Sequence, residues 1–277
     1  MKYLLVFLLI LLSSCVQVNH IYQLENNKPD LMPISIDLIS TQAINYQAKK
    51  ALFAEKNQTL YVLDELNNEI YFYKNNKLIN RVKQGSAGKY SLQKIADICL
   101  ANDGNLWALD YFDKAIIKLD SNGMPLTHFT LKETINPVSF ALLENSGVYV
   151  YDKAKNEILV YEPLTMKYIY SFAKMLFADN PYLSINKERL WAYDNKLSKT
   201  FIFSTTGKML TEREGQAFYD RFFNLFSFEN GLLKNEINNA NYPISFQNTG
   251  VISINDNHLT QISDKQIYIY KAQYETK

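Results

Sequence analysis

Four aspartates stand at nearly equal intervals along the chain, each at the end of a short apolar run. They are Asp64, Asp110, Asp152 and Asp194, spaced 46, 42 and 42 residues apart. Carboxylates brought together could hold a divalent cation or act as a general acid and base. A carboxylate at a strand end can instead accept the backbone N–H groups of the following turn. Because a catalytic site would break such regularity, we assign all four to structural repeat turns.

The stretch QGSAGKYSL, residues 84–92, has the glycines and the lysine of a phosphate-binding loop. That loop needs four residues between its glycines, a hydroxyl residue after its lysine, and a helix behind it. Here two residues separate Gly85 from Gly88, Tyr90 follows Lys89, and the next residues read as two strands. Since no helix N-terminus would face a phosphate, the stretch is a connection between structural units.

Other catalytic or cofactor chemistry has little support in the residue pattern. The three histidines, His20, His128 and His258, share no motif, so a histidine-based site is not indicated. We expect no cofactor and assign no metal ligand. A calcium ion held by carboxylates from separate parts of the chain stays open, because such a site leaves no local spacing. A net charge of +1 gives no reason to expect a nucleic-acid partner.

The aspartates belong to a repeat of short strands. Four segments read alike: TLYVLDELNNEIYFYKNNKLI, NLWALDYFDKAIIKLDSNGMPL, GVYVYDKAKNEILVYEPLTMKYI and RLWAYDNKLSKTFIFSTTGKML. Each has an apolar strand ending in Asp, a polar turn, a second apolar strand, another turn and a third strand. A period of about 40 to 45 residues made of strands is typical of a β-propeller, with one four-stranded blade per repeat. Strands such as LYVLD are apolar on both faces, as packing between neighbouring blades requires.

Two weaker copies follow the four clear ones. A further step of 42 residues from Asp194 reaches Glu236 in GLLKNEINNANYPISF, and a compressed copy ends the chain in HLTQISDKQIYIYKAQ. The last copy is one strand short, so we expect ISIDLIS, residues 34–40, to complete it. The prediction is an all-β propeller over residues 34–277, with six four-stranded blades and a ring closed by N- and C-terminal strands. Five blades would also fit the length.

The second copy, residues 85–126, resembles an NHL-type repeat. In that family a glycine-rich turn leads to an inner strand, then to a DGN turn, a strand ending in Asp, and a further strand before a D-x-x-G turn. This sequence has Asp103-Gly104-Asn105 and Asp120-Ser121-Asn122-Gly123 at those turns. The resemblance is good for one copy, fair for three and faint for two, and it implies a propeller rather than a particular activity.

The N-terminus, MKYLLVFLLILLSSC, resembles the signal of a bacterial lipoprotein. Its apolar run is too short to span a membrane and ends in small residues before Cys15. The resemblance implies that residues 1–14 are a signal peptide, that Cys15 is lipidated, and that residues 15–33 form a tether to the membrane. An ordinary signal peptide with a chance cysteine is the alternative. We expect a location in the bacterial cell envelope, with the outer membrane preferred in a two-membrane host because Val16 follows the cysteine.

Departures from the repeat are the candidates for binding a partner. Tyr111 and Phe112 follow Asp110 where the other copies have Glu-Leu, Lys-Ala and Asn-Lys. The stretch EREGQAFYDRFFNLF, residues 212–226, has charges and aromatics in place of a glycine turn, and we expect a short helix or an extended loop over one rim. Its candidate contact residues are Phe218, Tyr219 and Phe222.

These features favour a lipid-anchored, extracytoplasmic scaffold that binds an envelope protein or peptide. The alternative is a metal-dependent propeller hydrolase or lyase with its site in the central channel. Three or more converging carboxylates or histidines in the channel would favour the enzyme, and an apolar or plugged channel would favour the scaffold.

Overall fold

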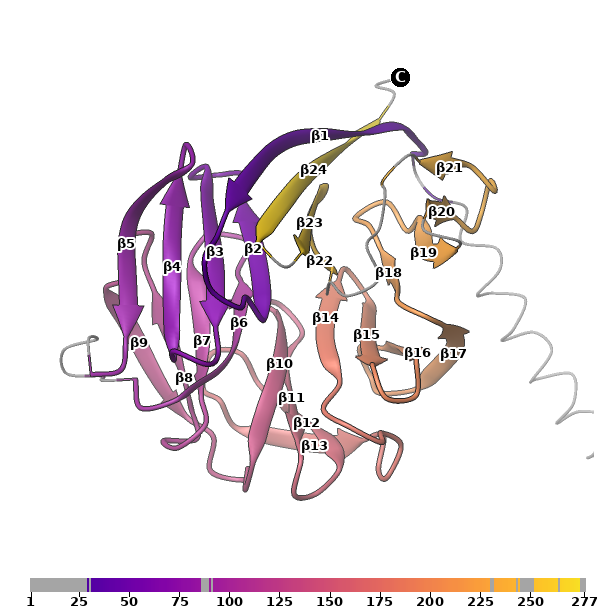
Figure 1. Cartoon of the computed structure of the whole chain (residues 1–277). Helices are drawn as coiled ribbons and strands as arrows, with labels where there is room; N and C mark the ends of the chain where they lie inside the picture. The colour runs from indigo at the N-terminus through magenta and orange to yellow at the C-terminus, as the bar shows by residue number, and fades with distance from the viewer. Residues whose placement is uncertain are drawn as a thin grey trace, which may run out of the picture.

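The computed structural model describes residues 29, 31–85, 90, 92–229, 232–242, 244, 252–263 and 265–274. Within them, 24 strands form six four-stranded antiparallel sheets arranged around a central axis (Figure 1). The predicted all-β, six-bladed propeller is confirmed, and the five-bladed alternative is wrong.

The blades follow one another along the chain, and the innermost strand of each comes first. Blade 1 contains β2 (Lys50–Ala54), β3 (Thr59–Asp64), β4 (Glu69–Lys74) and β5 (Lys77–Lys83). Blade 2 contains β6 (Ile95–Leu100), β7 (Leu106–Asp110), β8 (Ala115–Leu119) and β9 (Pro125–Thr130). Blade 3 contains β10 (Pro137–Leu143), β11 (Gly147–Asp152), β12 (Glu157–Tyr161) and β13 (Tyr168–Phe172). Blade 4 contains β14 (Tyr182–Asn186), β15 (Arg189–Asp194), β16 (Lys199–Ser204) and β17 (Met209–Glu214). Blade 5 contains β18 (Ala217–Tyr219), β19 (Leu225–Glu229), β20 (Leu232–Asn235) and β21 (Asn241–Tyr242). Blade 6 contains β22 (Ile252–Asn255), β23 (His258–Ser263), β24 (Gln266–Tyr274) and β1 (Pro33–Ala43).

Side-chain burial decreases from the axis of the ring to its circumference. Every residue of β2, β3, β7 and β11 is buried, as expected for sheets covered on both faces by neighbouring blades. The outer strands β5, β9 and β17 are mostly exposed or half-buried. The core therefore lies between the blades, and the inner strands form a rigid wall around the channel.

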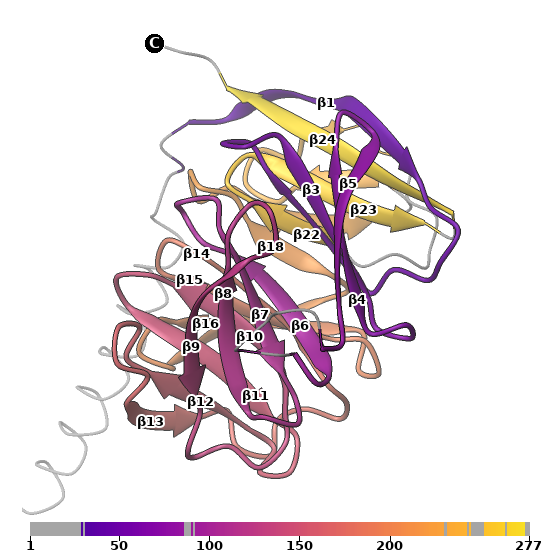
Figure 2. The same cartoon turned by 90° about the vertical axis from the view of Figure 1, so that its left-hand side faces the viewer.

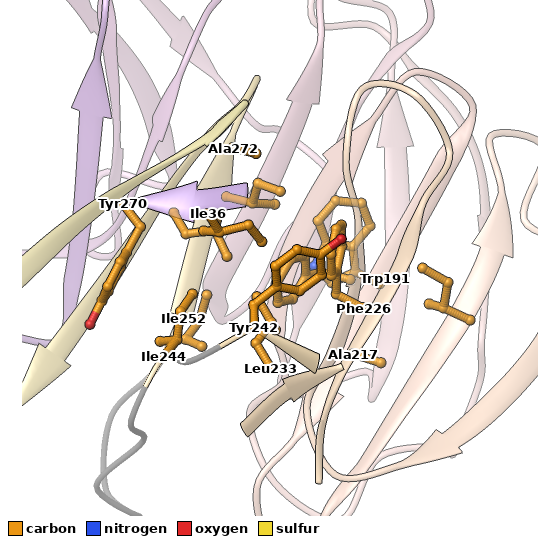
Figure 3. Packing of buried hydrophobic residues seen from close by; sticks show 14 of the residues in the cluster. Ile36, Trp191, Ala217, Phe226, Leu233, Tyr242, Ile244, Ile252, Tyr270 and Ala272 are labelled. Carbon is orange, nitrogen blue, oxygen red and sulfur yellow. The ribbon is translucent and has the colours of Figure 1, made fainter. Parts of the chain in front are cut away.

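The N-terminal strand closes the ring, as predicted. β1 pairs with β24 from Pro33 opposite Tyr274 to Ala43 opposite Gln266, and the two strands run side by side in Figures 1 and 2. A cluster of buried apolar residues from blades 4, 5 and 6 includes Ile36 of β1 (Figure 3). One blade is thus assembled from both ends of the folded chain, which leaves no gap in the ring.

Polar contacts also hold both ends of the chain to blade 5. The Tyr274 hydroxyl lies 2.6 Å from the Asp220 carboxylate, and the Asn224 amide donates to the Leu31 carbonyl at 2.8 Å. The Tyr242 hydroxyl donates to the Pro33 carbonyl at 2.9 Å. Since Asp220 and Asn224 lie in the turn between β18 and β19, this turn fixes where the chain joins the propeller.

The fifth repeat differs from its predicted alignment. Glu236 was expected at the end of the second strand, but Leu232–Asn235 is the third strand, β20, and Leu225–Glu229 is the second. The segment 212–226 is neither a helix nor a loop over the rim, because it contains the end of β17, all of β18 and the start of β19. The inner strand β18 has only three residues, so the spacing of the earlier repeats does not carry through blade 5.

Candidate functional site

The four repeat aspartates lie at the ends of the second strands and bind backbone groups. All four side chains are fully buried. Asp110 accepts N–H groups from Phe112 and Asp113 in the following turn, and from Gln93 and Lys94 ahead of its own inner strand. Asp152 and Asp194 accept the corresponding sets of four, and Asp64 accepts the backbone and side-chain N–H groups of Asn67. Asp110, Asp152 and Asp194 therefore each join a turn to the connection ahead of the inner strand, while the bonds of Asp64 lie within its own turn. We call the side of the ring that carries these four residues the aspartate face.

Tyr111 and Phe112 lie on this aspartate face. The Phe112 side chain is 64% exposed, and Tyr111 is half-buried. Their rings meet edge-on with centroids 5.3 Å apart, and the Lys94 ammonium lies 5.3 Å from the Tyr111 ring centroid. The structure thus places an exposed aromatic pair at a turn.

The candidate contact residues of the 212–226 segment, Phe218, Tyr219 and Phe222, lie towards the side of the ring opposite the aspartate face. Phe218 is only 2% exposed and packs on Phe226 with ring centroids 5.6 Å apart, so its expected availability to a partner is wrong. It points into the core because it belongs to the short inner strand β18. Tyr219 ends that strand half-buried, and Phe222 is half-buried in the turn that follows. Phe222 meets the Tyr274 ring at a centroid distance of 4.4 Å.

Of the two cysteines, Cys99 lies among the described residues and Cys15 does not. Cys15 lies outside the described residues, as do Gly88 and Lys89 of the phosphate-loop-like stretch. Cys99 is half-buried on β6, and burial raises the pKa of its thiol. In the part of the chain that the structure describes, no helix has the length and apolarity needed to cross a membrane.

All six inner strands end at one hollow of about 860 Å³, which we call the mouth. It is on the opposite side of the ring from the aspartate face, because each second strand runs antiparallel to its inner strand. The mouth is lined by residues at or just beyond the inner strand ends, including Glu55, Asn102, Leu143, Asn186, Arg221 and Asp256. Since each blade supplies part of the lining, the ring assembles a site that no single repeat contains.

Ion pairs organise the rim of the mouth. Lys271 lies 2.6 Å from one Glu55 oxygen, and the hydrogen bond that it donates lowers the pKa of that carboxyl. The Arg221 guanidinium lies 3.2 Å from each Asp256 oxygen. His258 Nδ1 lies 3.9 Å from the other Glu55 oxygen, too far for a hydrogen bond. Burial lowers the pKa of His258, so its imidazole is neutral at pH 7.

A buried ion pair lies in the channel wall below the mouth. Lys50 of β2 and Asp97 of β6 are 2.9 Å apart, and both side chains are almost fully buried. The second Asp97 oxygen accepts the N–H of Phe140 on β10, so one carboxylate joins three inner strands. This arrangement rigidifies the wall on which the mouth is built.

The mouth meets the residue composition expected of the enzyme but lacks the geometry of a metal site. Glu55, Asp256 and His258 all line it, so the channel is neither purely apolar nor plugged. Both carboxylates are already paired with cations. Among the described residues, no three His, Cys, Asp or Glu side chains form a group that could hold a metal ion.

Sequence reasoning missed most of the rim because its members come from different blades. Glu55 follows β2, Arg221 follows β18, and His258 begins β23. No local sequence motif links these three residues. Because the fifth repeat was aligned on Glu236, the sequence did not indicate that Arg221 follows an inner strand. An alignment of the residues that follow each inner strand would have grouped Glu55, Arg221 and Asp256.

Comparison with known proteins supports the fold. No protein-family model matches the sequence, and no curated protein matches it. A catalytically inactive virginiamycin B lyase from Staphylococcus aureus, solved with quinupristin, is 13% identical with a TM-score of 0.56, covering 83% of this chain and 82% of that one. The selenomethionine-substituted form of that lyase is also 13% identical, with a TM-score of 0.54 and 80% of each chain covered. The WD40 domain of Pan2 from Neurospora crassa is 8% identical, with a TM-score of 0.55, covering 90% of this chain and 99% of that one. Such low identities show a shared propeller fold alone.

Proposed function

We propose that this chain is a non-enzymatic binding module of the bacterial cell envelope, anchored by a lipid on Cys15, which holds a protein or peptide partner at the mouth of its propeller. The observation that carries the proposal is the mouth itself, a hollow of about 860 Å³ built from all six blades. A concave surface of this size, mostly preformed and lined by a few polar groups, is typical of binding sites. In this proposal the blades are NHL-type repeats that act as the scaffold.

The place where the chain joins the propeller supports an anchored module. Leu31 is bonded to Asn224, which lies two residues from Phe222 of the mouth. The chain therefore enters the fold at Leu31 on the same face as the mouth. The 19 residues from Cys15 to Pro33 span at most roughly 60 Å when extended. Confinement within that distance of the membrane, in the outer membrane of a two-membrane host, raises the effective concentration of the mouth for envelope partners.

A cross-linking pull-down from intact envelopes tests this function. The anchored chain is compared with a secreted Cys15→Ser form, and Cys99→Ser serves as a control that keeps the anchor. We expect one defined envelope protein to be recovered with the anchored chain and the Cys99→Ser control, but not with the Cys15→Ser form. Recovery of no stable partner by the anchored chain would contradict the proposal.

A hydrolase or lyase acting at the same mouth is the second candidate. The observation that favours it is that Glu55, Asp256 and His258 line one hollow. Turnover of ester, lactone or glycosidic substrates, with and without calcium, would support this candidate if it disappeared in a His258→Gln variant.

A further inference from the structure

Every blade carries a large exposed apolar side chain near its outer strand on the mouth side, the side of the ring opposite the aspartate face. The third strands run away from the aspartate face, so the turns that lead to the fourth strands lie on the mouth side. In blade 6 the start of β1 takes this place beside the end of β24. The six side chains, which we call the apolar ring, are between 41% and 81% exposed: Ile34, Leu78, Met124, Leu164, Met209 and Ile237. Single exposed apolar side chains are ordinary, but one per blade at the same place is a repeated feature of one side.

The turns that present the apolar ring have fixed conformations. The Glu162 carboxylate accepts the Leu164 N–H at 3.0 Å. Gly123, next to Met124, and Gly207 have φ angles of 77° and 81°, and a Cβ on either would lie 2.6 Å from a side chain of the preceding blade. These turns therefore pack tightly against their neighbours. A surface that meets the apolar ring would not have to order it first.

The chain enters the fold beside two members of the apolar ring. The Asn235 side chain accepts the Ile237 N–H at 2.9 Å, and its amide lies 4.0 Å from the Met32 sulfur. Met32 stands two residues before Ile34, and the proposed lipidated residue, Cys15, stands 17 residues before Met32. A bilayer that holds this lipid is therefore within reach of the mouth side, and the short connection gives it a high effective concentration there.

The turns of the mouth side have no excess of positive charge. The described outer turns contain four lysines and three carboxylates, which are Lys74, Lys77, Lys167, Lys208, Asp120, Glu162 and Glu236. The turns between inner and second strands contain four cations and six carboxylates, which are Lys56, Lys187, Arg189, Arg221, Glu55, Asp103, Glu144, Glu188, Asp220 and Asp256. Attraction to anionic lipid headgroups requires clusters of basic residues. Burial of hydrocarbon, rather than charge, must therefore hold this side to a membrane surface.

We infer that the mouth side of the propeller rests on the phospholipid bilayer that holds the anchor, with the apolar ring at the level of the lipid headgroups. The inference rests on the proposed lipid anchor, because the anchor identifies the bilayer as the surface that meets the ring. It goes beyond the proposed function because it sets the orientation of the propeller. The mouth faces the bilayer, the aspartate face points away from it, and an envelope partner reaches the mouth at the membrane surface.

Fluorescence quenching by labelled lipids tests this orientation. The full chain is taken in detergent from the membranes in which it is made and reconstituted into phosphatidylcholine vesicles. A fluorophore is attached at Leu164→Cys or at Leu66→Cys in a Cys99→Ser background. The two positions are a matched pair, since both leucines lie in turns, on opposite sides of the ring, and are 81% and 75% exposed.

Lipids with a nitroxide near the headgroup should quench the label at position 164 and not the label at position 66. We expect the fluorescence at position 164 to fall at least about twofold, because interfacial side chains lie about 5–10 Å into the headgroup boundary. Raising the salt to about 1 M, where the screening length is about 3 Å, should leave this loss unchanged.

Removing other members of the apolar ring should abolish the quenching at position 164. Leu78→Ser, Met124→Ser and Met209→Ser together remove exposed hydrocarbon without changing the charge. If this triple variant fails to fold, the comparison of the labels at positions 164 and 66 still tests the inference.

A matched control variant makes the same kind of change on the aspartate face. It combines Phe112→Ser, Ile135→Ser and Met175→Ser, three exposed residues of that face, and should keep the quenching at position 164. Equal quenching at positions 164 and 66, no quenching at position 164, or quenching that salt removes would overturn the inference. If the ring variant turned a dimer into a monomer in size-exclusion chromatography and kept its quenching, the ring would bind a second copy, which would also overturn the inference.

Flotation of the vesicles and the envelope pull-down separate this inference from the proposals on which it builds. If the chain does not float with the vesicles, the anchor and the orientation are both wrong. If it floats without quenching at position 164, the anchor stands and the orientation is wrong. If position 164 is quenched but the pull-down recovers no envelope partner, the orientation stands and the proposed binding function is wrong.

Discussion

At the scale of single residues, the buried carboxylates of the repeat turns connect parts of the chain that are distant in sequence. Asp110 joins its own turn to residues 93 and 94, which precede the inner strand of the same blade. An unsatisfied buried N–H group is costly, so several such groups depend on one side chain. Nothing about this arrangement requires chemistry at the aspartates.

Replacing Asp110 by Ala should therefore lower the free energy of unfolding by about 3 kcal/mol. The matched control is Asp113→Ala, an exposed aspartate of the same turn, whose effect should stay within about 0.5 kcal/mol. Urea unfolding of both variants measures the difference. Equal stability of the two variants would show that the buried hydrogen bonds are not the stabilising feature.

His258 should make stability depend on pH in the mildly acidic range. Glu55, Lys271, Asp256 and Arg221 surround it, and burial lowers its pKa below the ordinary value of about 6.5. The unfolded chain therefore takes up this proton before the folded chain does. Stability from this group is complete above pH 6.5 and declines as the pH falls towards the folded pKa, by at most about 1.4 kcal/mol per pH unit.

Urea unfolding at pH 7.5, 6.5 and 5.5 tests this linkage. The wild type should lose more stability on acidification than a His258→Gln variant, and the difference between them isolates His258. Equal pH dependence of the two proteins would mean that His258 is readily protonated in the folded chain.

At the scale of elements, the repeat also fixes where the strands bend. The third strands of blades 1 to 4 each show a register shift against the fourth strand, at Tyr73, Leu119, Tyr161 and Phe203. These residues all stand nine positions after the repeat aspartate. A bulge increases local twist, so the same position in four blades produces the same curvature towards the circumference.

The four clear blades and the closing strand could be predicted because their residues alternate strands and turns with a constant period. Blade 5 could not, since its inner strand has three residues and its outer strand has two. Elements this short leave no hydrophobic pattern, and their position is set by packing against blades 4 and 6. The misalignment at Glu236 follows directly from this shortness.

Removing the closing strand should destabilise the whole propeller. A chain starting at residue 44 lacks β1, which exposes the edge of β24 and the apolar surface that Ile36 covers. We expect this chain to aggregate or to unfold at a clearly lower temperature. A control that starts at residue 29 keeps every described strand and should melt like the full domain. Identical melting of both truncations, monitored with size-exclusion chromatography, would contradict a closing role for β1.

At the scale of the whole molecule, the ring separates two surfaces. The aspartate face carries Tyr111 and Phe112, whereas the opposite face carries the mouth with Phe222. The residues of the mouth could not be predicted as a set, because the chain brings them together only when the ring closes. The chain joins the propeller on the face of the mouth, where the Asn224 amide donates to the Leu31 carbonyl, so the proposed anchor and the proposed binding site would share one side of the propeller.

The proposed lipid anchor on Cys15 predicts where the protein resides. In a detergent phase-separation experiment, the wild-type chain should partition into the detergent phase, because a lipid on Cys15 inserts hydrocarbon into the micelle. It should also incorporate a palmitate analogue. A Cys15→Ser chain should lose the label and move to the aqueous phase, while Cys99→Ser should behave like the wild type. A labelled Cys15→Ser chain would contradict anchoring at this residue.

Photo-cross-linking in intact cells tests the central claim, that the mouth binds an envelope partner, most directly. A photoreactive phenylalanine analogue is placed at Phe222, at the mouth, or at Phe112, on the aspartate face. The account predicts one discrete adduct with an envelope protein from position 222 in the anchored chain, and none from position 112. An adduct from position 112 alone, or no adduct from position 222, would contradict it.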